Sequence, residues 1–94
     1  GPVPTPEQLD ELVPRLAALL GGVAEVVRER GMLYGRYRVY LETTKTGAPR
    51  KGGARLNVVL GGISKTGAVS ADVMARARAA LGAWVRGLDF DEGR

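Results

Sequence analysis

The chain has 94 residues, of which 45% are hydrophobic and 26% charged, and this suits one small domain with a modest core. It contains no cysteine and no histidine, so disulfides, thiolate or imidazole chemistry and ordinary zinc sites are excluded within it. No apolar run approaches the roughly 18–20 residues of a membrane span, and no signal-peptide pattern is present. We therefore expect a single basic domain over residues 1–94, with flexible ends at 1–4 and 89–94. The composition favours a bacterial or phage protein of the cytoplasm, away from membranes.

The net charge of +4 is concentrated in the middle of the chain. Residues 28–65 carry nine Lys and Arg against two Glu, a net +7, whereas residues 1–27 carry −3 and residues 66–94 are neutral. Such a concentration favours an anionic partner. A set of solvated loops is the alternative interpretation of the same pattern.

The first helix is predicted to begin at "TPEQ", residues 5–8. The Thr5 side chain can accept a hydrogen bond from the Gln8 amide, Gln8 can reach back to the Thr5 amide, and proline suits the first helical position. Pro14 lies well inside the segment, so we expect a kink there or two short helices. The glycine pair at 21–22 can end the helix. The apolar residues have helical spacing: Leu9, Leu12, Val13, Leu16 and Leu20.

The middle of the chain reads as strands and one long loop. Residues 23–30, "VAEVVRER", are ambiguous between a strand and a helical continuation, and we favour a strand. Residues 34–42, "YGRYRVYLE", alternate strictly, with apolar residues and glycine at the odd positions, and predict a strand over residues 33–44. The Gly and Pro content of residues 45–54, "KTGAPRKGGA", predicts a loop with three cations and no acid. Residues 55–63, "RLNVVLGGI", predict the next strand.

The segment 64–69, "SKTGAV", is predicted as a turn, and Ser70 as the N-cap of a last helix over residues 71–88. The apolar stripe of this helix consists of Val73, Ala77, Ala80, Leu81, Trp84, Val85 and Leu88. The predicted fold is α+β, in the order α-β-β-β-α. A small antiparallel sheet of two or three strands would have the N-terminal and C-terminal helices packed on one face. Its expected core residues are Leu33, Tyr37, Val39, Leu41, Leu56, Val58 and Leu60, against Trp84 and the first helix.

The other face of the sheet is predicted to be open and to hold arginine between tyrosines. Guanidinium groups match phosphates and the edge of guanine, and tyrosine rings offer a surface for stacking. Glycines in the loop would let its backbone approach phosphates closely. The predicted nucleic-acid-binding residues are Tyr34, Arg36, Arg38, Tyr40, Arg55 and Asn57 on the sheet, with Lys45, Arg50 and Lys51 in the loop. The alternative is an ordinary exposed face, stabilised by cross-strand pairs.

Residues 33–84 resemble the small sheet-plus-helix DNA-binding modules near the amino terminus of tyrosine integrases and some transposases. The matching features are Gly35-x-Tyr37-x-x-x-Leu41, Thr46-Gly47-x-x-Arg50-Lys51, Leu60-Gly61 and a helix with Ala75, Ala79 and Ala80. The resemblance implies that the sheet face enters a major groove. It would place Arg36, Arg38 and Tyr40 in the groove, and Arg50 and Lys51 near phosphates. A double-stranded-RNA-binding domain also runs helix, three strands, helix, but Asp72 stands where that family carries a lysine cluster.

We expect no catalysis, no cofactor and no metal. "GGISKTG" is similar to the end of a phosphate-binding loop, but Ser64 precedes Lys65 where glycine is required, and position 59 is valine. Glu42 has no second acid suitably placed to hold magnesium. The prediction is therefore a non-enzymatic domain that binds nucleic acid, DNA rather than RNA, within a recombination or replication protein. The alternatives are a phage-type structural or oligomeric assembly module, such as a homodimer, and a domain that binds an acidic protein.

Overall fold

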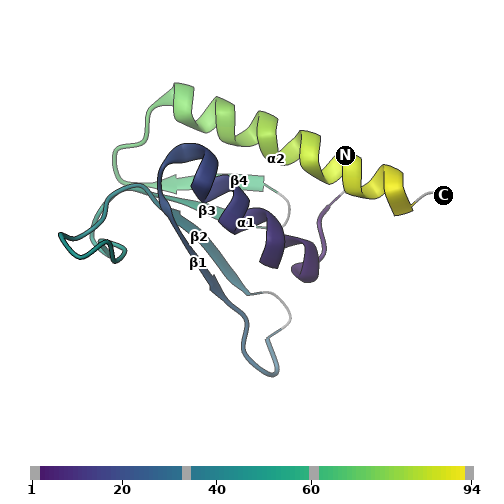
Figure 1. Cartoon of the computed structure of the whole chain (residues 1–94), viewed down its shortest axis with the longest axis horizontal. Helices are drawn as coiled ribbons and strands as arrows, with labels where there is room; N and C mark the ends of the chain where they lie inside the picture. Colours follow the sequence, from purple (N-terminus) through teal and green to yellow (C-terminus); the bar gives the residue numbers. More distant parts are fainter. Residues whose placement is uncertain (1–2, 33–34, 60–61, 93–94) are drawn as a thin grey trace.

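The chain forms six elements in the order helix, four strands, helix (Figure 1). The elements are α1 (Pro6–Leu20), β1 (Val23–Val27), β2 (Arg36–Tyr40), β3 (Arg55–Val59), β4 (Gly62–Thr66) and α2 (Ala71–Glu92). They are those of a computed structural model, which describes residues 3–32, 35–59 and 62–92, with side chains as far as Gly87. The predicted α+β class is confirmed, and the sheet has four strands where two or three were expected.

The sheet is an antiparallel meander in which each strand pairs with the next one along the chain. The ambiguous segment after α1 is therefore a strand, as favoured, and pairs with β2 over its whole length. Both helices lie on the same side of the sheet (Figure 1): α1 contacts β1 and β2, and α2 contacts β4 and α1. This leaves one sheet face covered by helices and the other without a helix over it.

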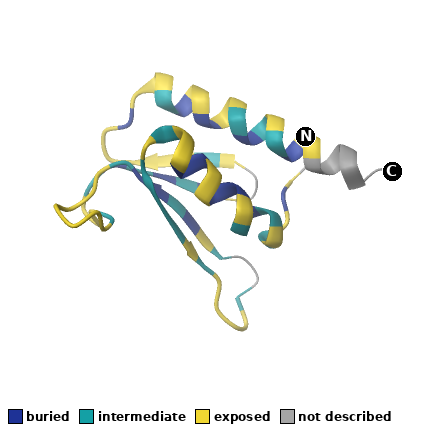
Figure 2. Ribbon diagram, viewed as in Figure 1, coloured by how far each residue is buried: buried dark blue, intermediate teal, exposed yellow. Residues whose placement is uncertain are grey.

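The hydrophobic core fills the space between the helices and the covered face (Figure 2). Strand alternation places Tyr37 and Val39 of β2, and Leu56 and Val58 of β3, on that face, where all four are buried as predicted. Trp84 packs partly buried at the margin of the core. The predicted core residues Leu33 and Leu60 lie outside the described residues. Both helices contribute buried residues, among them Leu9, Leu12, Val13, Leu16, Met74, Ala77, Leu81 and Val85.

The predicted start and end of α1 are both confirmed. The Thr5 hydroxyl accepts from the Gln8 amide at 3.1 Å, and the Gln8 side chain accepts from the Thr5 amide at 2.9 Å. Gly21 ends the helix with a left-handed φ of 72°. Pro14 lies inside one continuous helix, so the alternative of two short helices is wrong. The proline is exposed and the apolar residues around it remain buried, which keeps the helix packed across the missing hydrogen bond.

The fourth strand occupies a segment that the sequence pattern predicts as the end of one strand and the start of a turn. β4 pairs with β3 from Gly62 opposite Val59 to Thr66 opposite Arg55. Its side chains are exposed apart from the half-buried Ile63, so it lacks the apolar alternation by which strands are recognised. Backbone pairing with β3 holds it in place. The last helix begins as predicted, with the Ser70 hydroxyl accepting from the Val73 amide at 3.1 Å, and continues past residue 88 to Glu92.

Gly22, between α1 and β1, packs too closely against β2 for any side chain. A Cβ added there would lie 2.5 Å from the Tyr40 carbonyl oxygen and 3.0 Å from a methyl group of Val39. We expect Gly22→Ala to lower the free energy of unfolding by roughly 1–3 kcal/mol, measured by urea denaturation. Gly52→Ala is the matched control, because a Cβ there meets no atom within 4 Å. A Gly22→Ala variant as stable as this control would contradict the close approach of the two backbones.

Candidate nucleic-acid interface

The sheet face opposite the helices, here called the open face, carries the even-numbered side chains of β2 and the odd-numbered ones of β3. The pairing register places these side chains in three rows across the strands. Two rows cross all four strands: Val23, Tyr40, Arg55 and Thr66, and Glu25, Arg38, Asn57 and Ser64. The third consists of two separate pairs, Val27 with Arg36 and Val59 with Gly62. Five of the six predicted sheet residues are thus brought together, and the sixth, Tyr34, lies outside the described residues.

The expectation of an exposed Tyr40 ring is wrong, because only 1% of this residue is exposed. The loop of residues 45–54, here called the basic loop, folds back so that Lys51 Nζ lies 4.9 Å from the ring centroid. The Arg55 guanidinium lies 5.9 Å from the same centroid. The Tyr40 hydroxyl accepts from Arg38 Nη1 at 3.3 Å and donates to Glu25 Oε1 at 3.5 Å. The ring is therefore part of the support beneath the cations and offers no free surface for stacking.

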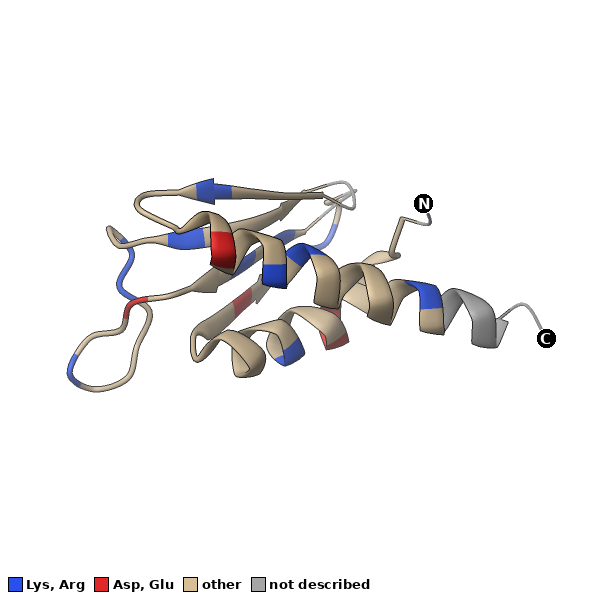
Figure 3. Cartoon of the chain, turned by 90° about the horizontal axis from the view of Figure 1, so that it is seen from above, with Lys and Arg blue, Asp and Glu red and all other residues tan. Residues whose placement is uncertain are grey.

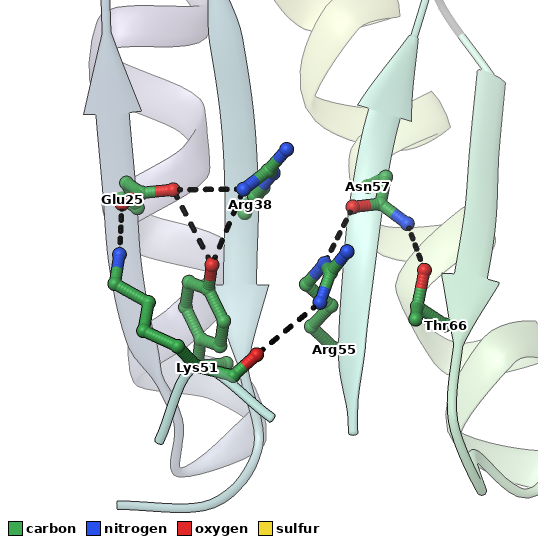
Figure 4. Close-up of polar contacts among 7 residues, drawn as sticks. Glu25, Arg38, Lys51, Arg55, Asn57 and Thr66 are labelled. Atoms are coloured by element: carbon green, nitrogen blue, oxygen red, sulfur yellow. Dashed lines mark hydrogen bonds and ion pairs between the residues drawn. The ribbon is translucent and has the colours of Figure 1, made fainter. Parts of the chain in front are cut away.

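Glu25 is a member of this site that the sequence analysis did not include (Figure 4). Its Oε1 lies 3.5 Å from Arg38 Nη1, its Oε2 pairs with Lys51 Nζ, and its side chain is only 18% exposed. The hydrogen bond from Lys51 lowers the pKa of Glu25; burial opposes this, and the charges of Lys51, Arg38 and Arg36 add to it. The same hydrogen bond raises the pKa of Lys51. Only the strand register brings Glu25 beside Arg38, and this register cannot be read from the spacing of residues in β1.

This ion pair predicts an acid-sensitive component of stability. The pKa of Glu25 is lower in the folded protein than its ordinary value of 4.5, so the ionised carboxylate stabilises the fold above that pH. The contribution is lost as the pH falls through the lowered pKa. We expect wild type to melt at a higher temperature than Glu25→Gln at about pH 7, and the difference to shrink towards about pH 3. A difference that is undiminished in acid would contradict the assigned pairing.

Arg55 is held by a chain of side chains that crosses β3 and β4. Its Nε donates to Asn57 Oδ1 at 3.2 Å, and Asn57 Nδ2 donates to Thr66 Oγ1 at 3.1 Å (Figure 4). Arg55 Nη1 also reaches the Lys51 carbonyl at 3.5 Å. Asn57 thus positions an arginine, and the unpredicted strand β4 contributes the last member of the chain. The guanidinium is oriented before any ligand arrives.

The basic loop divides its three cations between two places. Lys51 lies over the open face through its contacts with Glu25 and Tyr40, whereas Lys45 and Arg50 are exposed on the loop itself. The loop projects past the end of the sheet, and Lys and Arg lie along both the strands and the loop (Figure 3). Arg50 Nη1 lies 3.7 Å from Glu42 Oε1, and the other oxygen of Glu42 accepts from the Ala54 amide. Glu42 therefore ties the loop to its stem.

Other kinds of site find no support in the part of the chain that the structure describes. That part contains no group of three or more acidic residues placed to hold a metal ion. Neither helix, over its described residues, is both long enough and apolar enough to cross a membrane.

Comparisons with protein-family models, curated proteins and solved structures give no match. Fold and site together define a two-layer α+β domain with helices on one side of a four-stranded sheet and a basic face on the other.

Proposed function

We propose that this domain binds nucleic acid, DNA rather than RNA, through the open face and the basic loop. The observation that carries the proposal is the charge of a face that no helix covers. Among the described residues, the open face and the part of the basic loop over it hold three arginines and Lys51 against the single carboxylate of Glu25, a net +3. A concentrated positive field of this kind attracts the phosphate backbone.

The arrangement of the arginines supports contacts with a duplex. Arg36 and Arg38 are two residues apart on one strand, and their side chains therefore project from points about 6.8 Å apart, or two base-pair steps. Arginine can bind phosphate oxygens or the edge of guanine in the major groove. Stacking of unpaired bases receives less support, because the ring of Tyr40 is covered. The proposed role is therefore that of a non-enzymatic DNA-binding domain within a recombination or replication protein.

The test is a titration of the protein with a DNA duplex, a single strand of the same sequence and the matching RNA, at two salt concentrations. If about five cations of the face and loop each neutralise a phosphate, log K should fall with log salt at a slope of about −4 to −5. The duplex should bind most tightly at about 50 mM salt. Absence of salt-dependent binding to all three ligands would overturn the proposal.

Self-assembly is the second candidate, and one observation favours it. Val59 is 54% exposed on the open face, where a second copy could cover it. Such a contact would rest on apolar surface, so a dimer or larger oligomer should persist at high salt. Light scattering at about 1 M salt decides the question, because charge–charge contacts are screened there within about 3 Å. A monomer under those conditions would overturn this candidate.

A further inference from the structure

The carboxylate of Glu25 lies beside two cations of the proposed interface, in the position that a phosphate of the ligand would need to occupy. It is the one carboxylate among the described residues of the open face, and it lies in the middle row beside Arg38. Each of its oxygens contacts a different cation, Oε1 with Arg38 and Oε2 with Lys51. A nucleic-acid phosphate likewise presents two anionic oxygens to arginine and lysine. The carboxylate and a phosphate are therefore alternative partners for the same two side chains.

The two cations differ in how easily they can change partner. Lys51 is 63% exposed and reaches Glu25 from the basic loop. This loop is fixed to the residues before it by the Leu41 amide, which donates to the Ala54 carbonyl, and by the pairing of Thr43 with Pro49. The lysine side chain can consequently swing from the carboxylate to a ligand without any unpairing of the sheet. Arg38 is more enclosed, between Glu25 and the Tyr40 hydroxyl, and would keep its place on the strand.

We infer that Glu25 is an internal counter-anion, which a phosphate of the nucleic acid displaces from Lys51 and Arg38 on binding. The inference rests on the proposed function and adds a mechanism that limits affinity. Each binding event has to replace an existing ion pair, and the freed carboxylate then faces the phosphates of the ligand. Glu25 thereby lowers affinity for weakly charged ligands and reserves the face for those with several adjacent phosphates.

The experiment compares wild type with Glu25→Gln on the duplex used above. The amide has nearly the same shape as the carboxylate but no charge, so binding should be about three- to tenfold tighter at about 50 mM salt. The gain should shrink at about 200 mM salt, where repulsion between separated charges is screened. Glu11→Gln is the matched control, because Glu11 is exposed on α1 and its replacement changes the net charge equally. This control should bind within about twofold of wild type, because α1 packs on the covered side of the sheet, opposite the open face.

The outcomes separate the two proposals. If wild type shows no salt-dependent binding, the proposed function fails. If wild type binds but Glu25→Gln binds equally or more weakly, only the role of Glu25 fails. A gain in Glu11→Gln as large as that in Glu25→Gln would also overturn that role, because net charge alone would then explain it.

A second variant covers the case in which Glu25→Gln does not fold. Lys51→Gln leaves Glu25 in place and removes the cation that is inferred to transfer. It should weaken duplex binding about three- to tenfold, because the ligand loses one contact and meets an unscreened carboxylate. Duplex binding equal to that of wild type would overturn the transfer of Lys51.

Discussion

Replacing both Arg36 and Arg38 by alanine is expected to weaken duplex binding at least tenfold. A bidentate arginine contact with a base edge is worth about 1–3 kcal/mol of discrimination against the wrong base. Where the two arginines contact phosphates instead, their loss also makes the salt dependence shallower by about 1–2 in slope. The free energy of unfolding should change little. Arg36 is exposed, and the 3.5 Å pair between Arg38 and Glu25 is partly solvated, a class of contact that contributes about 0–1 kcal/mol.

The control for this variant is the replacement of Arg76 and Arg78 by alanine. Both are exposed on α2, which packs on the other side of the sheet, and the pair removes the same charge. Fluorescence anisotropy of a labelled duplex would measure the duplex affinity of wild type and of the two double variants. Equal losses in the two double variants would assign binding to net charge rather than to the open face. No loss in either variant would exclude the face as the interface.

Tyr40→Ala is expected to have the largest effect on stability of any substitution on the open face. The ring is 1% exposed and lies against Lys51 and Arg55, so its removal leaves a cavity beneath both cations. Truncation of a buried aromatic residue lowers the free energy of unfolding by about 3–5 kcal/mol. That is a large part of the roughly 5–15 kcal/mol by which small domains are stable.

Tyr40→Phe is the matched comparison, because it keeps the ring and removes only the hydroxyl. The contacts of that hydroxyl with Arg38 and Glu25 are long, at 3.3 and 3.5 Å, so the loss should stay near 1 kcal/mol or below. Urea denaturation of both variants gives the difference. If Tyr40→Ala unfolds at the same urea concentration as Tyr40→Phe, the ring is not buried in solution.

Local patterns predict those parts of the fold that depend on neighbours in sequence. Alternation in residues 36–40 identifies Tyr37 and Val39 as the covered side of β2, and the spacing of Thr5 and Gln8 identifies the start of α1. The sequence pattern did not predict β4 as a strand, because its polar residues show no alternation. Only its pairing with β3 makes it a strand. No local pattern carries that information.

The sequence predicted that the arginines lie together on the open face, but it did not predict the contacts that they make there. Arg36, Arg38 and Arg55 share the open face because strand alternation requires it, and alternation is visible in the sequence. The burial of Tyr40 depends on a loop residue that reaches a carboxylate 26 positions earlier, from Lys51 to Glu25. Such a contact is set by sheet register and by the path of the loop, which composition and periodicity do not encode.

The meander has a consequence for how the chain acquires its structure. Every strand pairs with its successor, so the sheet can assemble as a series of hairpins whose closure costs little chain entropy. Topologies dominated by such local pairing fold fast for their size. The 22 residues of α2 follow all four strands, and during synthesis the ribosome releases them after the sheet. Until then β4 and α1 lack the helix that packs against them, and docking of α2 completes the hydrophobic core.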